Sequence, residues 1–280
     1  MRKIGLIDYY LDEYHAHEAF VSLQSLGGDK TGFTIVSAYA EKDSDSGLTT
    51  DAFCKQHGIK RADSIAELCG DVDCLMILSP DDNDKKEGYA IEAIKYGKPI
   101  FMDKTFTDSY ESAVRIFDAA DKAGVPLFSS SSLRYASELQ PYKGDATSVL
   151  AFGSGVKLDL YLVHYLEIVY TCMGAGVEKV RHEQRGNQEW AHIYYRDGRC
   201  ATVVISIGEH MDFQVLIADS ESKTNSFSIV SPIFRLQMEM ILDFFNKGKA
   251  SFDRAETLEL MRTIDAIKQS KREAGAFVVI

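Results

Sequence analysis

The first 130 residues alternate short apolar runs with stretches of helical periodicity, and this alternation restricts the fold more than any other feature. The expected strands are 3–7, 33–39, 74–78, 99–102 and 127–130, and the clearest helical stretches between them are 14–26, 84–97 and 108–123. Strands that are apolar at every position are covered on both faces, as in parallel sheets. Repeated strand–helix–strand units form doubly wound sheets. We therefore predict a doubly wound parallel sheet over residues 1–128, with the first strand in its interior.

The pattern changes after about residue 129. Expected strands are 147–153, 177–185, 189–196, 200–207, 212–218 and 276–280, and expected helices are 158–173, 233–246 and 254–272. Several of these strands are joined by tight turns, which is typical of antiparallel neighbours. The sequence thus predicts an α/β protein with a second, α+β domain over residues 129–280, built on an open antiparallel sheet.

Charge and cysteine content exclude several classes of protein. The net charge of −11, with no Lys/Arg-rich run, disfavours nucleic-acid partners. The five cysteines form no C-x-x-C pair, so neither a disulfide framework nor a metal site is suggested. The first apolar stretch is interrupted by Asp8, and no later stretch is long and apolar enough for a membrane span. We expect a cytoplasmic protein without membrane partners.

Four stretches resemble segments of the glucose–fructose oxidoreductase and inositol dehydrogenase (Gfo/Idh/MocA) family. They are 73–80, similar to a family strand with its Thr/Ser-Pro loop; 93–105, similar to the "G-K-x-V-x-x-E-K-P" segment; 159–174, similar to the helix with the family histidine; and 241–280, similar to the family ending. The resemblance implies a Rossmann-like domain, NAD or NADP as cofactor, and hydride transfer to or from a sugar, polyol or related hydroxy compound. It also implies a homo-oligomer formed through the second sheet.

The resemblance assigns cofactor or catalytic roles to three residues that follow expected strands. Ser79 and Pro80 form the loop near the cofactor, and Lys104 corresponds to the family lysine that contacts cofactor and substrate. A lysine at this sheet edge can hydrogen-bond a substrate hydroxyl and stabilise its ionised form. Asp103 replaces the family glutamate, and Thr105 replaces the family proline.

The second catalytic segment is the helix over 158–173. His164 corresponds to the family histidine and can take a hydroxyl proton. Tyr161 and Glu167 share its helical face at i, i+3 spacing, and Glu167 could orient the imidazole. The family places an acid four residues before the histidine, where this chain has Leu160; Asp159 is one residue away. A buried structural histidine is therefore an open alternative.

The loop after the first strand departs most from the family. Three glycines are needed there for a tight turn and for close approach of the diphosphate. They align with Asp8, Tyr10 and Glu13, two of which are acids. Two like charges about 4 Å apart interact by about 1 kcal/mol in water and by more near a protein surface. We expect weak or no dinucleotide binding in the usual pose, although Glu41 after the second strand could hold a ribose diol.

Two hypotheses therefore remain open. The chain is an NAD(P)-dependent oxidoreductase, as Lys104 and His164 suggest, or it is a family relative that has lost redox chemistry and serves as a ligand-binding or oligomeric interaction protein, as Asp8, Tyr10 and Glu13 suggest. A cofactor held in a shifted pose is a further alternative. Specificity depends on loop detail, so the substrate itself is beyond sequence reasoning.

Overall fold

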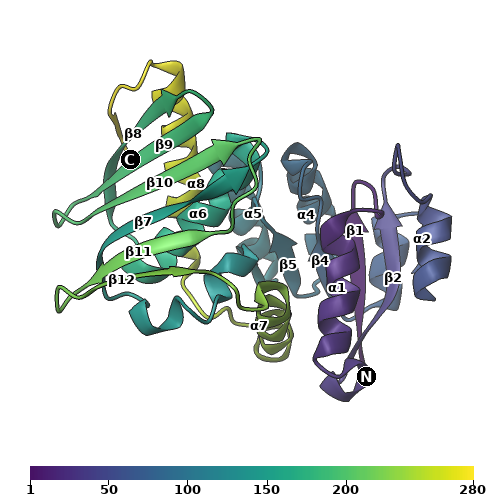
Figure 1. The fold of residues 1–280 in the computed structure, drawn as a ribbon. Helices are drawn as coiled ribbons and strands as arrows, with labels where there is room; N and C mark the ends of the chain where they lie inside the picture. Colours follow the sequence, from purple (N-terminus) through teal and green to yellow (C-terminus); the bar gives the residue numbers. More distant parts are fainter. The chain divides into compact units, whose positions relative to one another are not determined.

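The computed structural model describes residues 1–280 and divides into two compact units. The first, the Rossmann unit, comprises Met1–Ser130 and Phe234–Phe252; the second, the mixed-sheet unit, comprises Ser131–Ile233 and Asp253–Ile280. Their elements are drawn in Figure 1. No helix in the structure is both long and apolar enough to cross a membrane.

Six parallel strands form the sheet of the Rossmann unit. They are β1 (Arg2–Asp8), β2 (Phe33–Ala40), β3 (Lys60–Arg61), β4 (Cys74–Ile77), β5 (Ile100–Asp103) and β6 (Leu127–Ser130). Their order is β3-β2-β1-β4-β5-β6, and every neighbouring pair is parallel. The predicted doubly wound sheet with an interior first strand is confirmed. The strand order reverses between β1 and β4, which is where such sheets bind ligands.

Helices connect these strands. They are α1 (Tyr14–Ser25), α2 (Thr50–His57), α3 (Ile65–Asp71), α4 (Lys86–Ile94) and α5 (Tyr110–Ala123), with 3₁₀ turns at Gly28–Thr31 and Asn83–Lys85. The sequence pattern did not reveal α2, α3 or β3. Each has eight residues or fewer, which is too short for an apolar periodicity to repeat reliably.

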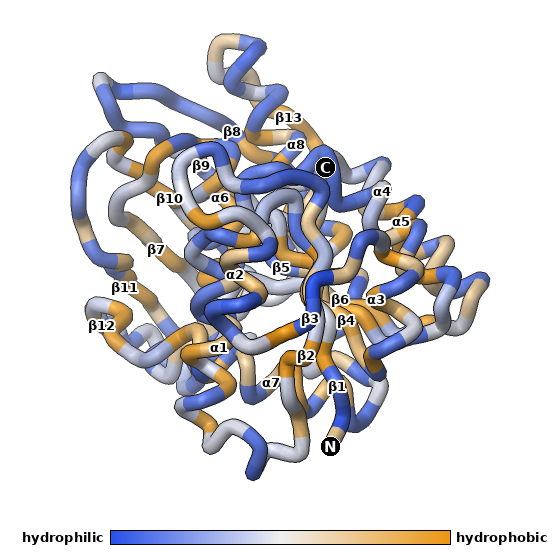
Figure 2. Tube along the Cα trace, turned by 90° about the vertical axis from the view of Figure 1, so that its right-hand side faces the viewer, coloured by the Kyte–Doolittle hydropathy of each residue, from blue (hydrophilic) through white to orange (hydrophobic).

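A late helix completes the core of the Rossmann unit. Helix α7 (Ile233–Lys247) belongs to this unit from Phe234 onward, although about a hundred residues of chain separate it from β6. Its buried face packs with Ile4, Phe33 and Phe128 in one hydrophobic cluster. Figure 2 shows apolar colour concentrated on the strands and on parts of the helices, with many connecting loops hydrophilic.

The second sheet is mixed rather than antiparallel throughout. Its strands are β7 (Ala146–Gly155), β8 (Val177–Arg185), β9 (Gln188–Tyr195), β10 (Cys200–Ile207), β11 (Gln214–Asp219), β12 (Thr224–Ser228) and β13 (Val278–Val279), in the order β12-β11-β7-β10-β9-β8-β13. The pair β7–β10 is parallel and the others are antiparallel. The helix after β7 brings the chain back, so β8 starts in the direction of β7, and two turns later β10 shares that direction. The predicted uniform antiparallel sheet is corrected accordingly.

Two long helices, α6 (Leu158–Met173) and α8 (Arg254–Arg272), pack against one face of this sheet and against each other (Figure 1). Short 3₁₀ turns lie at Ser132–Tyr135 and Gln140–Tyr142. Buried Arg134 donates to Glu167 of α6 and to Glu256 of α8, both at 2.5 Å. Removing one member of such a buried ionic group leaves uncompensated charge, so this cluster ties the two helices together.

Candidate functional site

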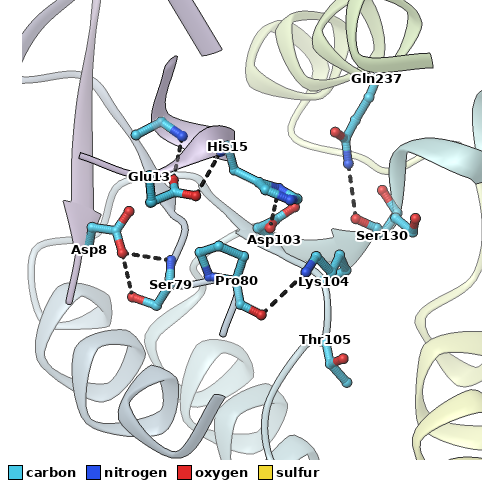
Figure 3. A network of polar contacts seen from close by, with 12 residues as sticks. Asp8, Glu13, His15, Ser79, Pro80, Asp103, Lys104, Thr105, Ser130 and Gln237 are labelled. Atoms are coloured by element: carbon cyan, nitrogen blue, oxygen red, sulfur yellow. Dashed lines mark hydrogen bonds and ion pairs between the residues drawn. The ribbon is translucent and has the colours of Figure 1, made fainter. Parts of the chain in front are cut away.

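The candidate site of the Rossmann unit lies at the carboxyl ends of β1, β4 and β5. These ends carry Asp8, the Ser79–Pro80 loop and the Asp103–Lys104 pair, and Figure 3 shows them in one polar network. Asp8, Ser79 and Lys104 are all buried. The sheet reverses its winding between β1 and β4, so this is the edge where a dinucleotide fold receives its ligand.

Asp8 bridges the end of β1 to the loop after β4. Its Oδ1 accepts hydrogen bonds from Tyr9 N at 2.7 Å, Ser79 N at 2.9 Å and Ser79 Oγ at 3.0 Å. Its Oδ2 is buried and has no hydrogen-bond partner. Burial raises the pKa of Asp8 to about 7, against the lowering effect of these hydrogen bonds. The crevice between β1 and β4 is thus closed by a carboxyl group that holds its proton unusually tightly.

Glu13 occupies the N-terminus of α1. Its carboxylate accepts from His15 N at 2.7 Å and from Ala16 N, as an N-cap does. Burial, followed by the charge of Asp8, raises the pKa of Glu13 to about 9. Because burial raises the pKa of both carboxyl groups, this loop carries less negative charge near neutral pH than the sequence alone suggests.

Lys104 is positioned by a second, fully buried lysine. Lys86 Nζ donates to the carbonyl oxygens of Asp103, Lys104 and Thr105, each at 2.9 Å. Burial lowers the pKa of Lys86 to about 7. Three bonds from one ammonium group to consecutive carbonyls hold the turn from which the Lys104 side chain projects. Lys104 Nζ itself donates only to Pro80 O, at 3.3 Å.

Asp103 faces α1. Its Oδ2 lies 2.8 Å from His15 Nδ1. Burial works to raise the pKa of Asp103, but His15, Lys86 and Lys104 outweigh it and lower that pKa to about 2. From the far side, Gln237 of α7 donates to Ser130 O at the end of β6 at 3.0 Å, as Figure 3 shows. Neither Lys86 nor the His15–Asp103 contact was found by sequence reasoning, because no local pattern distinguishes a buried lysine from a solvated one.

The remaining expected cofactor residues lie beside this network. Glu41, after β2, accepts from Tyr89 OH at 2.6 Å and lies 3.8 Å from Lys85 Nζ. Tyr10 is partly buried, with its ring edge-on to that of Tyr9 at 6.2 Å between centroids. Glu41 therefore already has protein partners where a ribose diol was expected.

The candidate residues of the mixed-sheet unit lie on α6. His164 Nδ1 is 2.6 Å from Ser131 Oγ, and Tyr161 stacks edge-on to the imidazole at 5.6 Å. Glu167 Oε1 accepts from Ser131 N at 2.8 Å, so it supports the residue that contacts the histidine. Asp159 is exposed in the first turn of α6. Ser131 was not singled out from the sequence, where it reads as part of a serine-rich loop.

The fold is that of two-domain dehydrogenases. The probable dehydrogenase from Thermotoga maritima matches with a TM-score of 0.79 at 13% identity, over 99% of this chain and 98% of that one. GenD2 of gentamicin A biosynthesis, solved with NAD, matches with 0.79 at 13% over 100% and 97%. Apo scyllo-inositol dehydrogenase from Lactobacillus casei matches with 0.78 at 12% over 100% and 98%.

A family model matches part of the sequence. Residues 22–131 match the model of the Gfo/Idh/MocA oxidoreductase family, described as an NAD-binding Rossmann fold. No curated protein matches the sequence. The resemblance to the Gfo/Idh/MocA family is therefore confirmed, by sequence within the Rossmann unit and by fold over the whole chain.

The diphosphate of a dinucleotide does not fit the first loop as the structure has it. The amide groups of His15 and Ala16, which a diphosphate would use at the start of α1, are bound by Glu13. Asp8 closes the crevice through Ser79, and its buried Oδ2 finds no donor. A bound diphosphate would have to displace Glu13 and share this space with Asp8.

Proposed function

We propose that the chain is an oxidoreductase-type protein that acts on a sugar, polyol or related hydroxy compound. The observation that carries this proposal is the state of Lys104. The side chain is buried, yet its ammonium group has one acceptor, a carbonyl at 3.3 Å, for three N–H groups. A buried ammonium with unused donors at the carboxyl edge of a Rossmann sheet suits a ligand oxygen.

Lys104 and His164 would divide the work on a ligand hydroxyl. Lys104 Nζ would donate to the hydroxyl oxygen and stabilise negative charge on it. His164 Nε2 would accept the hydroxyl proton, while Ser131 Oγ fixes Nδ1 at 2.6 Å and so sets the orientation of the ring. Tyr161 and Asp159 would contact the ligand beside the histidine. This division requires Lys104 and His164 to face one ligand, which we include in the proposal.

The second candidate is a relative that binds the hydroxylated ligand without redox chemistry. Glu13 favours it, because this carboxylate occupies the helix N-terminus that a dinucleotide needs. NAD or NADP is the cofactor that the family resemblance suggests, and we infer that it is not held in the usual pose while Glu13 caps α1. We likewise infer that Asp8, Tyr10 and Glu41, the other residues expected at the cofactor, do not hold NAD or NADP in the usual pose.

Calorimetric titration with NADH and NADPH separates the two candidates. The native chain is expected to bind both weakly or not at all, and the triple variant Asp8→Gly, Tyr10→Gly, Glu13→Gly should gain affinity by about tenfold or more if the rest of the pocket is intact. Low-micromolar binding of NADH or NADPH by the native chain would support the oxidoreductase candidate. It would also refute the inference that Asp8 and Glu13 block the diphosphate site. No gain in the folded triple variant would favour the non-redox candidate.

A panel of sugars and polyols tests the ligand part of the proposal. Lys104→Met should abolish binding of whichever compound binds the native chain, whereas Lys98→Met, on the loop before β5, should not. Unchanged affinity in folded Lys104→Met would remove Lys104 from the site and the proposal with it.

We also propose a homo-oligomer formed through the open face of the second sheet, in the cytoplasm. This face carries Phe152, Trp190 and Leu216, each partly exposed, and the buried Trp190 Nε1 has no partner. All five cysteines are unpaired, which suits a reducing compartment. Sedimentation at micromolar concentration should give a dimer or larger species; Leu216→Glu should dissociate it, and a monomeric native chain would refute the proposal.

A further inference from the structure

A second pocket lies wholly within the mixed-sheet unit, between the start of α6 and the end of α8. Its volume is about 500 Å³, which is in the range of small-molecule sites. It is lined by Val156, Lys157, Leu158, Asp159, Glu189, Ile207, Lys268, Lys271 and Arg272. None of these residues except Asp159 belongs to the function proposed above.

Four of the lining side chains are cations, in a chain whose net charge is −11. Lys157, Lys268 and Arg272 form no ion pair or side-chain hydrogen bond with the protein. By contrast, Lys60 pairs with Asp71 of α3, and Lys247 pairs with Asp243 of its own helix. Three cations around one pocket repel each other. Although the chain is rich in acidic residues, none of them forms an ion pair with these three cations. A bound anion would remove that repulsion.

The buried acid of the pocket is already neutralised. Glu189 lies at the start of β9 and is 6% exposed. Its Oε1 accepts from Lys271 Nζ and its Oε2 from His182 Nε2, each at 2.5 Å. Glu189 and Lys271 therefore cancel, and Asp159 offsets one of the three remaining cations. The pocket keeps an excess of positive charge.

The backbone adds hydrogen-bond donors, with partial positive charge, at the same pocket. Lys157 is the N-cap of the sixteen-residue helix α6, and no side chain caps this end. The amide groups of Leu158 and Asp159 therefore remain available at the pocket wall, where the positive end of the helix dipole lies. Lys157 lies at the beginning of α6, whereas Lys268 and Arg272 lie one turn apart at the end of α8, so the pocket is lined by cations from two segments that are far apart in sequence.

We propose that this pocket binds a phosphate group, either as inorganic phosphate or as the phosphomonoester of a small molecule. Lysine ammonium groups and uncapped helix amides are common phosphate ligands, and a guanidinium adds a planar pair of donors. The volume leaves room for a ligand of sugar size beyond the phosphate. The proposal is independent of the oxidoreductase function and of the first loop.

Calorimetric titration at constant ionic strength with inorganic phosphate, glucose 6-phosphate and glucose tests this site. Phosphate and the ester should bind through Lys268 and Arg272, whereas any binding of glucose at the Lys104 site should not depend on these two residues. Tighter binding of the ester than of phosphate would show that the pocket also contacts the organic part. The double variant Lys268→Met, Arg272→Met should lose about tenfold or more in affinity. The control Lys143→Met, an exposed lysine of the same unit, should bind as the native chain does.

A gain-of-binding variant protects the test against misfolding. Asp159→Asn removes the one negative charge of the pocket that has no ion-pair partner and should strengthen phosphate binding severalfold. Absence of binding by either phosphate compound at millimolar concentration would overturn the proposal. So would equal affinity of the native chain and the folded double variant.

Discussion

Replacing Asp8 with asparagine isolates the unusual charge state of the first loop. The side chain keeps its shape, and the amide oxygen can still accept the three hydrogen bonds that Oδ1 receives from Tyr9 and Ser79. The change falls on Oδ2, which has no partner in the structure. The variant therefore removes a titrating group with little loss of native contacts.

The size of the effect follows from the pKa of Asp8. Burial raises this pKa from 3.8 to about 7, and a shift of that size corresponds to about 4 kcal/mol of differential stability. Part of that energy is shared with Glu13, whose pKa the charge of Asp8 also raises. The new amide hydrogens cost something if they find no acceptor. We expect Asp8→Asn to increase the free energy of unfolding by about 1–3 kcal/mol at pH 8.

The sign of the pH dependence is defined. Because the pKa of Asp8 is higher in the folded than in the unfolded chain, the folded state binds the proton more tightly. The stabilising contribution of protonated Asp8 is complete below pH 3.8 and is lost as the pH rises to about 7. The native chain should lose stability over this window, and Asp8→Asn should lose less. Glu13 should still produce a decline toward pH 9 in both proteins.

Urea unfolding of the native chain and of Asp8→Asn between pH 4.5 and 8.5 measures the difference. The two free-energy curves should approach each other at the acid end and separate toward pH 8. The control is Asp29→Asn, an exposed residue of a surface turn, which should follow the native curve. Parallel curves for native chain and Asp8→Asn would refute the assignment of a raised pKa to Asp8.

Two further substitutions test the buried cations. Lys86→Met leaves the three carbonyls of residues 103–105 without their donor and should destabilise the chain by about 3 kcal/mol in thermal or urea unfolding. The control Lys95→Met, at an exposed position, should change stability by less than about 0.5 kcal/mol. Equal effects of the two substitutions would contradict the role of Lys86. Arg134→Met leaves Glu167 and Glu256 uncompensated and should cost about 3–5 kcal/mol. The exposed ion pair of Arg115 with Glu87 is worth at most about 1 kcal/mol, so Arg115→Met losing as much as Arg134→Met would show that burial does not matter here.

Local patterns in the sequence determined most of the elements. The repeated alternation of short strands and helices predicted a parallel sheet, and the fully apolar run that became β4 supported it, because a strand covered on both faces shows no polar alternation. The helical periodicities of α1, α5, α6 and α8 were equally legible. The Lys104 segment was found by its resemblance to a family segment. Its position after an expected strand then placed it at the ligand-binding edge of the sheet.

Only the tertiary structure decided how distant residues meet. Nothing local indicates that α7 joins the core of the Rossmann unit, that β7 and β10 lie parallel, or that Lys86 binds the carbonyls of the Lys104 turn. The same holds for the charge of Asp8 and Glu13, which sequence reasoning took as fully negative. A periodicity records which face of an element is buried, whereas a pKa or an ion pair depends on which other element covers that face, and chain topology decides that.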